Sequence, residues 1–306
     1  MSYMEKTAKI IDGKAHAAAI RAEVKARIEQ IAPNKRHYKK PALAVILVGD
    51  DPASLAYIKG KQSACEEVGI DFQLHKLPDT AKEHDVASLI NKLNHSKPCP
   101  GILLQQPLPA YMDKNSLLEQ INPTNDVDCL NPLNLGRAMN GEGRRGTKML
   151  PCTPAGIITL LKRENIQIPG KRAVIVGRSE IVGKPLAFLM LQENATVTIC
   201  HSHTQNLPEI CRDADILVSA VGVPKFITAD FVKPGAVVID VGVNRINSDE
   251  IDDLSGEHKT RLCGDVDFDN VAAIASYITP VPGGVGPMTV ATLMENCVKA
   301  WEVQDV

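Results

Sequence analysis

The stretch from Lys171 to Pro185, KRAVIVGRSEIVGKP, decides the fold class of the second half of this chain. It begins as a β-branched strand over 172–176, breaks at the turn GRS over 177–179, and passes through VGKP into an apolar run over 186–191. Nucleotide-binding folds hold phosphate with this order of strand, glycine turn and helix start. Glycine admits close backbone approach, and the free N–H groups of the helix N-terminus face the anion. The spacing differs from G-x-G-x-x-G, so the motif alone is a weak signal.

Residues beyond the glycine turn favour a particular cofactor. Arg178 lies inside the turn, where a guanidinium has a natural partner in the 2′-phosphate of NADP. The next apolar strand, 195–200, is followed by Ser202 and His203, with no acid between 196 and 205. An NAD enzyme usually carries an acid near this point for the ribose 2′-OH. The sequence therefore predicts NADP, with NAD, or a solvated loop that binds no nucleotide, as the alternatives.

Length and charge bound the class of protein. The 306 residues suit two domains, and with 44% hydrophobic and 23% charged residues the chain can bury an ordinary core. A net charge of −2 gives no electrostatic case for a nucleic-acid or membrane partner. No apolar run is long enough to span a bilayer, and the N-terminal residues lack the features of a signal or transit peptide.

The cysteines and histidines predict neither disulfides nor a metal site. Eight cysteines are scattered along the chain and never spaced as C-x-x-C, which is typical of reduced thiols in a cytoplasmic protein. His201 and His203 form an H-x-H pair, but a loop pair without a nearby cysteine partner is more often solvated. We therefore expect no metal.

Strand and helix patterns alternate along the whole chain. This predicts an α/β fold with two domains: an N-terminal α/β substrate domain over 1–152, and a Rossmann-type parallel-sheet nucleotide-binding domain over 153–286, with a cleft between them. A C-terminal helix at about 287–306 is expected to pack back on the first domain. The predicted strands are 42–48, 72–77, 101–105, 172–176, 195–200, 215–219, 236–240 and 277–279, and the main helices are 15–31, 53–68, 86–93, 155–163 and 288–303.

Tyr57 and Lys61 lie four residues apart in a predicted helix, so their side chains share one face. A lysine in a partly desolvated site has a lowered pKa and can exchange protons near neutral pH, and an adjacent tyrosine can orient or relay. The alternative is a surface lysine beside a half-buried tyrosine. Tyr-x-x-x-Lys also occurs in short-chain dehydrogenases, but there it follows the nucleotide-binding turn, whereas here it precedes it.

Three further segments carry candidate ligand-binding groups. Gln105 and Gln106 end a buried strand, and the carboxyl ends of strands are where α/β sheets bind ligands, so an amide there could hold Lys61. The loop segment DVD at 126–128 offers carboxylates for a donor–donor edge such as an aminopyrimidinone. The glycines of PVPGGVGPMT at 280–289 would let backbone approach a flat ligand. The structural alternatives are strand termination, a solvated acidic turn and a tight connection.

Together these segments resemble the bifunctional methylenetetrahydrofolate dehydrogenase/methenyltetrahydrofolate cyclohydrolase family, over essentially the whole chain and at the length of its stand-alone form. The marks are IIDGKAHA at 10–17, the Tyr57/Lys61 pair, QQPLP at 105–109, DVD at 126–128, PCTPAG at 151–156, GRSEIVGKP at 177–185, CHSHT at 200–204 and PGGVGPMT at 282–289.

The resemblance implies a role for each matching residue. Lys61 matches the catalytic lysine, Tyr57 the tyrosine that stacks on or orients the folate, Gln105 the glutamine that positions the lysine, and Asp128 the aspartate that anchors the pterin. Further implied substrate contacts are Leu104, Gln106, Pro282, Gly283, Gly284, Val285 and Gly286. Implied NADP contacts are Gly177, Arg178, Ser179, Ser202 and Val243.

The implied activity has two steps: oxidation of 5,10-methylenetetrahydrofolate with NADP, then hydrolysis of the methenyl product to 10-formyltetrahydrofolate. The resemblance also implies a homodimer formed through the nucleotide-binding domains. Gln106, Cys129 and His203 depart from the family pattern, in which leucine, glycine and a basic residue are common. The alternatives are another two-domain dehydrogenase, of the shikimate dehydrogenase type, and a non-catalytic folate or nucleotide sensor.

Overall fold

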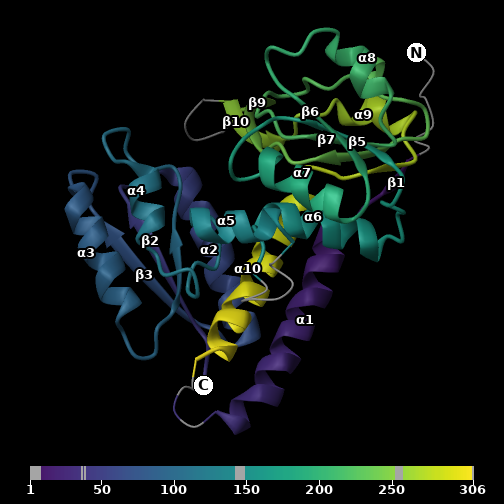
Figure 1. The fold of residues 1–306 in the computed structure, drawn as a ribbon. Coiled ribbons are helices and arrows are strands. Elements are labelled where there is room, and N and C mark those ends of the chain that lie inside the picture. The colour runs from purple at the N-terminus through teal and green to yellow at the C-terminus, as the bar shows by residue number, and fades with distance from the viewer. Residues whose placement is uncertain (1–7, 36, 38, 142–148, 252–257, 305–306) are drawn as a thin grey trace. The chain divides into compact units, whose positions relative to one another are not determined.

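The computed structural model describes residues 8–35, 37, 39–141, 149–251 and 258–304, and it divides into two compact α/β units (Figure 1). The unit with residues 17–152 and 289–304 is called the three-stranded unit, after its sheet. The unit with residues 8–16 and 153–288 is called the six-stranded unit. The chain therefore passes between the units three times.

The three-stranded unit is built on a parallel sheet in the order β3-β2-β4. The central strand β2 (Ala42–Val48) is buried at every position, as expected of a strand with helices on both faces. The edge strand β3 (Asp71–Leu77) is only partly buried, and β4 (Gly101–Leu104) is the other edge. In Figure 1, α3 and α4 lie on one side of this sheet and α2 on the other. The helices are α1 (Gly13–Ile31, followed by η1, Ala32–Asn34), α2 (Pro52–Val68), α3 (Glu83–Asn94), α4 (Lys114–Glu119), α5 (Pro132–Met139) and α10 (Val285–Glu302).

Local signals define both ends of α2. The Asp51 side chain accepts a hydrogen bond from the Ser54 backbone N–H at 2.7 Å, and Pro52 occupies the first helical position, where its missing N–H costs nothing. Gly69 ends the helix in the left-handed conformation, with φ of 87°. These caps fix the two ends of the helix that carries Tyr57 and Lys61.

The six-stranded unit has an all-parallel sheet in the order β1-β11-β8-β7-β5-β6, which confirms the predicted fold class. The strand order reverses at β5, since β6 lies on one side of it and β7 on the other. Open α/β sheets bind ligands at such a switch point. The strands are β1 (Lys9–Ile10), β5 (Arg172–Val176), β6 (Thr196–Cys200), β7 (Ile216–Ser219), β8 (Val237–Asp240) and β11 (Tyr277–Ile278).

Helices cover both faces of this sheet. The buried core on one face includes side chains of α8 (Leu207–Arg212), η3 (Ala229–Phe231) and α9 (Phe268–Ala272). Figure 1 shows α6 (Cys152–Arg163) and α7 (Gly183–Gln192) on the other face. A separate antiparallel hairpin, β9 (Asn244–Ile251) and β10 (His258–Cys263), extends the unit.

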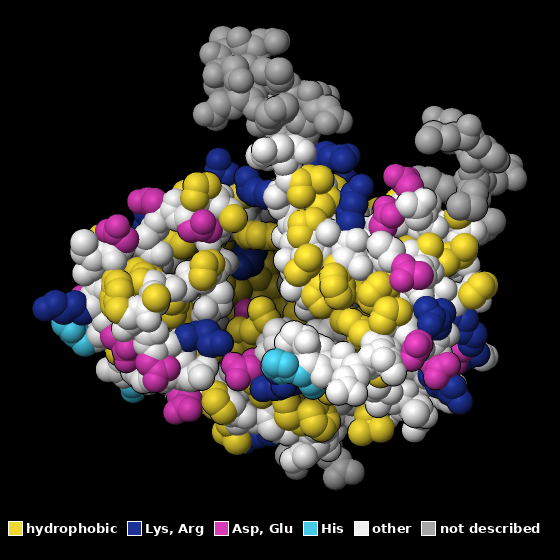
Figure 2. All heavy atoms as spheres, turned by 90° about the horizontal axis from the view of Figure 1, so that it is seen from above, with side chains coloured by type: hydrophobic (Ala, Val, Ile, Leu, Met, Phe, Trp, Pro, Cys, Tyr) yellow, Lys and Arg dark blue, Asp and Glu magenta, His cyan; other side chains and the backbone are white. Residues whose placement is uncertain are grey.

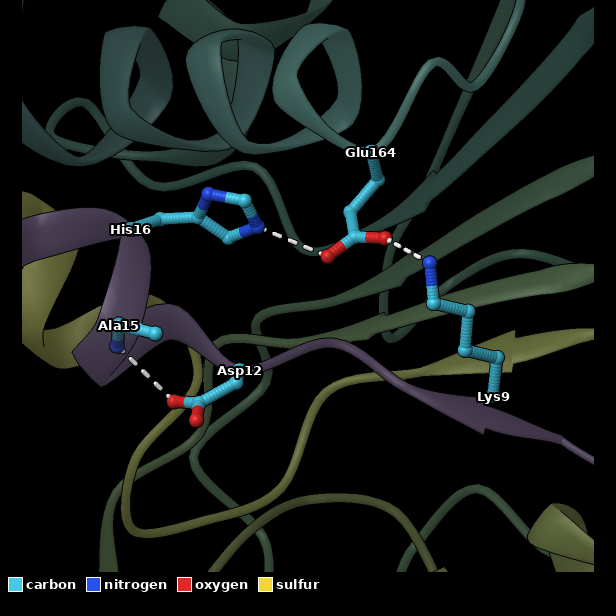
Figure 3. Close-up of polar contacts among 5 residues, drawn as sticks. All are labelled: Lys9, Asp12, Ala15, His16 and Glu164. Carbon is cyan, nitrogen blue, oxygen red and sulfur yellow. Dashed lines mark hydrogen bonds and ion pairs between the residues drawn. The ribbon is translucent and has the colours of Figure 1, made fainter. Parts of the chain in front are cut away.

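The first described residues lie in the six-stranded unit, although the sequence pattern assigned 1–152 to one domain. Strand β1 pairs with β11, an interaction between distant parts of the chain that no local pattern reveals. Figure 3 shows the polar contacts that accompany it: Glu164 accepts from Lys9 Nζ at 2.7 Å and lies 2.8 Å from His16 Nε2. Asp12 caps the start of α1 by accepting from the Ala15 N–H at 3.0 Å.

The elements otherwise differ from expectation mainly at ends and in short pieces. Helix α10 begins at Val285 rather than at about 287, and the last two residues of the predicted segment lie outside the described residues. The pattern did not predict β1, the β9–β10 hairpin, α4, α5, α8 or α9, which are short or lack a clean period.

The surface carries mixed charge. On the face seen in Figure 2, acidic and basic side chains of the described residues are interspersed, as a net charge of −2 would suggest. Among the helices of the described residues, none combines the length and apolar character needed to cross a membrane.

Two helical glycines provide a test of the packing around the phosphate turn. A Cβ on Gly183 would lie 2.1 Å from the Gly177 carbonyl oxygen, whereas one on Gly136 would meet nothing within 4 Å. We expect Gly183→Ala to destabilise the protein by about 1–3 kcal/mol, because backbone must move. Gly136→Ala should stabilise it by about 0.5–1 kcal/mol. Chemical denaturation of both variants measures this, and equal effects would contradict the packing described.

Candidate active site

Lys61 lies on α2 with its side chain half-buried in the three-stranded unit. Its Nζ donates a hydrogen bond to Gln105 Oε1 at 2.7 Å. Burial lowers the pKa of the Lys61 amine, and the nearby charge of Asp128 opposes that shift. The Lys61 ammonium is therefore more acidic than that of an exposed lysine, and the hydrogen bond to Gln105 fixes its direction. A group that transfers protons needs both properties.

Gln105 is held firmly at the end of β4. Its backbone N–H donates to the Ile46 carbonyl oxygen at 2.9 Å, and the residue is buried. Its side-chain Nε2 donates to the Gln106 carbonyl oxygen at 2.7 Å. Because that contact requires the amide nitrogen, the amide oxygen is turned toward Lys61. The structure therefore brings together the lysine and the glutamine that sequence analysis singled out separately.

The two carboxylates of the DVD segment have different environments. Asp126 is buried and accepts from the Leu130 N–H, the Asn131 N–H and Asn134 Nδ2, at 3.2, 2.9 and 2.9 Å. Burial raises the pKa of Asp126 to about 6 despite these bonds. Asp126 is therefore committed to holding the loop. Asp128 is half-buried, acts on the pKa of Lys61 through its charge and forms a side-chain hydrogen bond with Cys152, so it is the more accessible of the two carboxylates.

The remaining predicted residues of this unit lie around the same strand end. Tyr57 is nearly half exposed, one helical turn before Lys61, and Leu104 is buried at the end of β4. The Gln106 amide nitrogen is buried and has no hydrogen-bond partner among the described residues. Cys129 has φ of 59°, in the left-handed region that favours glycine. Glycine, which the family resemblance implies at this position, would adopt this conformation without strain.

A second group of candidate residues surrounds a cavity of about 500 Å³ in the six-stranded unit. It opens beyond the carboxyl ends of β5, β6 and β7, at the switch point of the sheet. Gly177 has φ of 127°, and a Cβ there would lie 2.3 Å from the Ala220 carbonyl oxygen, so only glycine fits. The lining residues are Val176, Gly177, Arg178, His201, Ser202, Thr204, Leu207, Ala220, Val221, Val223 and Phe226.

The predicted cofactor residues do not all line this cavity. Arg178 and Ser202 are exposed and line it, with the guanidinium following β5 and the hydroxyl following β6. The Ser179 hydroxyl oxygen accepts from the Val182 and Gly183 N–H groups, at 3.2 and 3.3 Å, and so holds the turn into α7. Val243 is exposed after β8 and is not among the lining residues.

Sequence reasoning missed several residues that shape this cavity. His201 and Thr204 line it, and they are joined by a 2.8 Å hydrogen bond from the His201 N–H to Thr204 Oγ1. His203, which the sequence places two residues further along the same loop, is not among the lining residues. The signal that could have found His201 was its position directly after β6.

Two buried aspartates behind the cavity were also missed. Asp265 accepts from the Val221 and Gly222 N–H groups at 2.7 and 3.1 Å, which fixes the wall that follows β7. Asp240 accepts from the Asp265 N–H at 2.9 Å, and burial raises the pKa of Asp240 to about 7. Sequence analysis identified neither residue, because most of their hydrogen-bond partners lie in distant segments of the chain.

The glycine loop over 282–286 rests on the start of α1 in the six-stranded unit. A Cβ on Gly13 would lie 1.8 Å from the Gly284 carbonyl oxygen, so the segment 12–14 and this loop are in direct backbone contact. Gly283 has φ of 112°, which requires glycine. Val285 and Gly286 already form the first turn of α10. The contact requires glycine at position 13.

The residues around the cavity fit a dinucleotide. Gly177 and Gly183 leave no room for a Cβ, the N-terminus of α7 follows the turn, and Arg178 supplies the only guanidinium of the lining. Nothing comparable exists for a metal: the described residues contain no group of three His, Cys, Asp or Glu side chains placed to hold one.

Two family descriptions match the chain. Residues 11–128 match the "Tetrahydrofolate dehydrogenase/cyclohydrolase, catalytic domain", and residues 151–305 match the corresponding "NAD(P)-binding domain". Among curated relatives, the "Bifunctional protein FolD" of Agathobacter rectalis is 51% identical over 96% of this chain and 99% of the relative. That of Bacillus cytotoxicus is 50% identical over 95% of this chain and 96% of the relative.

Solved structures agree with these matches. The bifunctional FolD methylenetetrahydrofolate dehydrogenase/cyclohydrolase of Campylobacter jejuni is 43% identical, with a TM-score of 0.87 over 96% of this chain and 98% of that one. The Trypanosoma brucei enzyme, solved with NADP cofactor and an inhibitor, is 36% identical, with a TM-score of 0.89 over 96% of this chain and 97% of that one.

Arg178 provides a test of cofactor choice. We expect Arg178→Ala to weaken NADP binding by about 10- to 100-fold, because a charge-assisted hydrogen bond is worth about 1.5–3 kcal/mol. NAD has no 2′-phosphate, so its binding should change little. Titration of the variant with each dinucleotide, with Lys184→Ala as a matched cation control on the same turn, measures the difference. Equal losses for both cofactors would rule out a 2′-phosphate contact.

Proposed function

The chain belongs to the tetrahydrofolate dehydrogenase/cyclohydrolase family. From this premise we propose that it catalyses two consecutive reactions and which residues serve each of them. The enzyme oxidises 5,10-methylenetetrahydrofolate to the 5,10-methenyl cation with NADP, and then hydrolyses that cation to 10-formyltetrahydrofolate. The observation that carries the division of roles is the 2.7 Å contact between Lys61 and Gln105, on a lysine whose pKa burial lowers. This reading sets aside the shikimate-type dehydrogenase and the non-catalytic sensor.

In the dehydrogenase step the protein serves to orient the folate and the dinucleotide. NADP, when bound, accepts the hydride that leaves the bridging methylene carbon. No proton moves in this step, so no side chain acts as acid or base, and placement of the reactants supplies the rate. We assign binding of the dinucleotide to Gly177, Arg178, Ser179, Ser202 and Val243. Of these, Ser179 acts by holding the turn into α7, since its hydroxyl oxygen accepts two backbone N–H groups of that turn.

The cyclohydrolase step asks for proton transfer. Water adds to the methenyl carbon and loses one proton, N5 is protonated and its bond to that carbon breaks, and the hydroxyl on the carbon then loses its proton to become the formyl oxygen, so that one proton is released overall. We assign these transfers to Lys61, with Gln105 as the residue that positions its amine and Tyr57 as the residue that orients the folate. The charge of Asp128 raises the pKa of Lys61 and so offsets part of the lowering that burial causes.

Folate recognition is assigned to groups that present fixed polar atoms or bare backbone. The Asp128 carboxylate pairs with the donor edge of the pterin, while Asp126 holds the loop in place. Leu104, Gln106 and the loop Pro282, Gly283, Gly284, Val285 and Gly286 complete the proposed contacts. The buried Gln106 amide nitrogen, which has no described partner, is a donor that leucine at this position would lack.

We also infer a homodimer formed through the six-stranded unit. Strand β6 is an edge of its sheet, and Ile199 on it is more than a third exposed. Phe188 and Leu191 on α7, which packs beside β6, are also exposed apolar side chains. An apolar edge strand of this kind is normally covered.

The eight free thiols fit the proposed cytoplasmic location.

Asp128→Asn tests the pterin anchor. The amide cannot accept two hydrogen bonds with the strength of a carboxylate, so we expect the KM for folate to rise by about 10-fold or more in both reactions. Steady-state assays of each activity, with Asp126 left intact, measure this. A loss confined to the cyclohydrolase would instead place Asp128 in proton transfer.

Lys61→Met tests the division between the two chemistries. Methionine keeps the apolar stem, so folding and folate binding should survive, whereas loss of the acid–base group should slow the cyclohydrolase by about 10²–10⁴-fold. Given methylenetetrahydrofolate and NADP, the variant should form NADPH and accumulate the methenyl product. Absorbance at the methenyl and NADPH bands follows both.

The matched control is Lys59→Met, two residues away on the exposed side of α2, which should leave both activities unchanged. If Lys61→Met hydrolyses methenyltetrahydrofolate at the wild-type rate, Lys61 is not the proton-transfer group. If a folded Lys61→Met forms no NADPH, the lysine is required for the hydride step or for binding.

A further inference from the structure

Asn296 is a fully buried amide in the middle of α10, a helix of otherwise mainly apolar buried residues. Its Nδ2 donates to the Val127 carbonyl oxygen and to the Leu150 carbonyl oxygen, each at 2.9 Å. It also lies 3.6 Å from Cys152 Sγ. A buried polar side chain costs free energy unless it is satisfied, so this amide is retained for the backbone groups that it binds.

The orientation of the Asn296 amide is set by chemistry. Two carbonyl oxygens face one end of the side chain, so that end must be the NH₂ group. The other end, Oδ1, lies 3.4 Å from Lys299 Nζ, one turn later on the same helix. Both N–H bonds of Asn296 are therefore engaged by the Val127 and Leu150 carbonyl oxygens, and neither is free for a ligand.

Val127 is the residue immediately before Asp128, and its peptide is held from several sides. Cys152 Sγ donates to the same Val127 carbonyl oxygen at 3.4 Å. The Val127 side chain is packed so closely on Gly101 that a Cβ there would lie 2.5 Å from Val127 Cγ1. Together with the loop bonds of Asp126, these contacts fix the backbone on which the Asp128 carboxylate is carried.

We propose that Asn296 is a positioning residue for folate: by binding the Val127 carbonyl oxygen it fixes the direction of the Asp128 carboxylate, without touching substrate itself. This inference rests on the proposed role of Asp128 as the pterin anchor. It adds that the geometry of this anchor is set by α10, a helix more than 150 residues away in sequence. Removal of the Asn296 amide should let the 127–128 peptide rotate and so displace the Asp128 carboxylate. A misplacement of about 1 Å can cost about 100-fold in rate.

The expected effect of Asn296→Ala is a rise of about 10-fold or more in the KM for folate in both reactions. The dissociation constant for NADP should be unchanged, since the cofactor residues lie in the other unit. Asn296→Ser, which keeps one donor and leaves a smaller space, should give an intermediate KM and serves as the test if the alanine variant does not fold.

Thr292 offers a matched control one turn earlier on α10. Its hydroxyl is buried and has no hydrogen-bond partner among the described residues. Thr292→Val keeps the shape and removes only that hydroxyl, so the KM for folate should stay at the wild-type value. A rise equal to that of the Asn296 variants would mean that any polar change in α10 disturbs the site, and would overturn the inference.

A double-mutant cycle separates this inference from the proposed function. If Asn296 acts through Asp128, the KM for folate of the Asn296→Ser/Asp128→Asn double variant should equal that of Asp128→Asn alone. Effects that multiply in the double variant would show that Asn296 acts independently, and would overturn the inference while leaving the anchor role intact. If Asp128→Asn alone leaves the KM unchanged, the anchor role itself fails, and the inference fails with it.

Discussion

Parallel strand pairing is the constraint on which both groups of functional residues depend. Parallel strands place all their carboxyl ends at one edge of the sheet, so segments far apart in sequence meet there. In the three-stranded unit, pairing of β2 with β4 brings Gln105 to the end of the sheet, where α2 presents Lys61. In the six-stranded unit, pairing of β5 with β6 and β7 brings the turns after all three strands around one cavity.

Buried polar groups then fix the positions of the side chains and loops at these sheet edges. Lys61 is directed by an amide whose own nitrogen is engaged, so the acceptor cannot turn away. Asp126 and Asp265 serve the backbone rather than a ligand, and each holds a loop that would otherwise be free to move. Asp128 is half-buried and Arg178 and Ser202 are exposed, whereas the supporting Asp126 and Asp265 are fully buried. Catalytic geometry needs such support, since a loosely held side chain forfeits the gain from proximity.

Much of the architecture could be predicted from local pattern. The continuous apolar run of β2 and the β-branched run of β5 predicted strands with the observed bounds, because each is buried on both faces. The glycines at 177 and 183 indicated a phosphate-binding turn. The structure explains why glycine stands at both positions, since neither has space for a Cβ. The boundaries of α10 and the short helices were less predictable, because their stability comes from packing more than from their own sequence.

The sequence by itself determined the alternation of strands and helices, the glycine turn with its arginine, and the Tyr57/Lys61 spacing on one helical face. These depend on residues within one or two turns of each other, so local physics suffices. Only the tertiary structure decided that Asp126 is fully buried while Asp128 is half-buried, that His201 rather than His203 lines the cavity, that β1 joins the second sheet, and that Asn296 binds the peptide before Asp128. Each of these depends on a contact between segments distant in the chain, and periodicity and composition carry no information about such contacts.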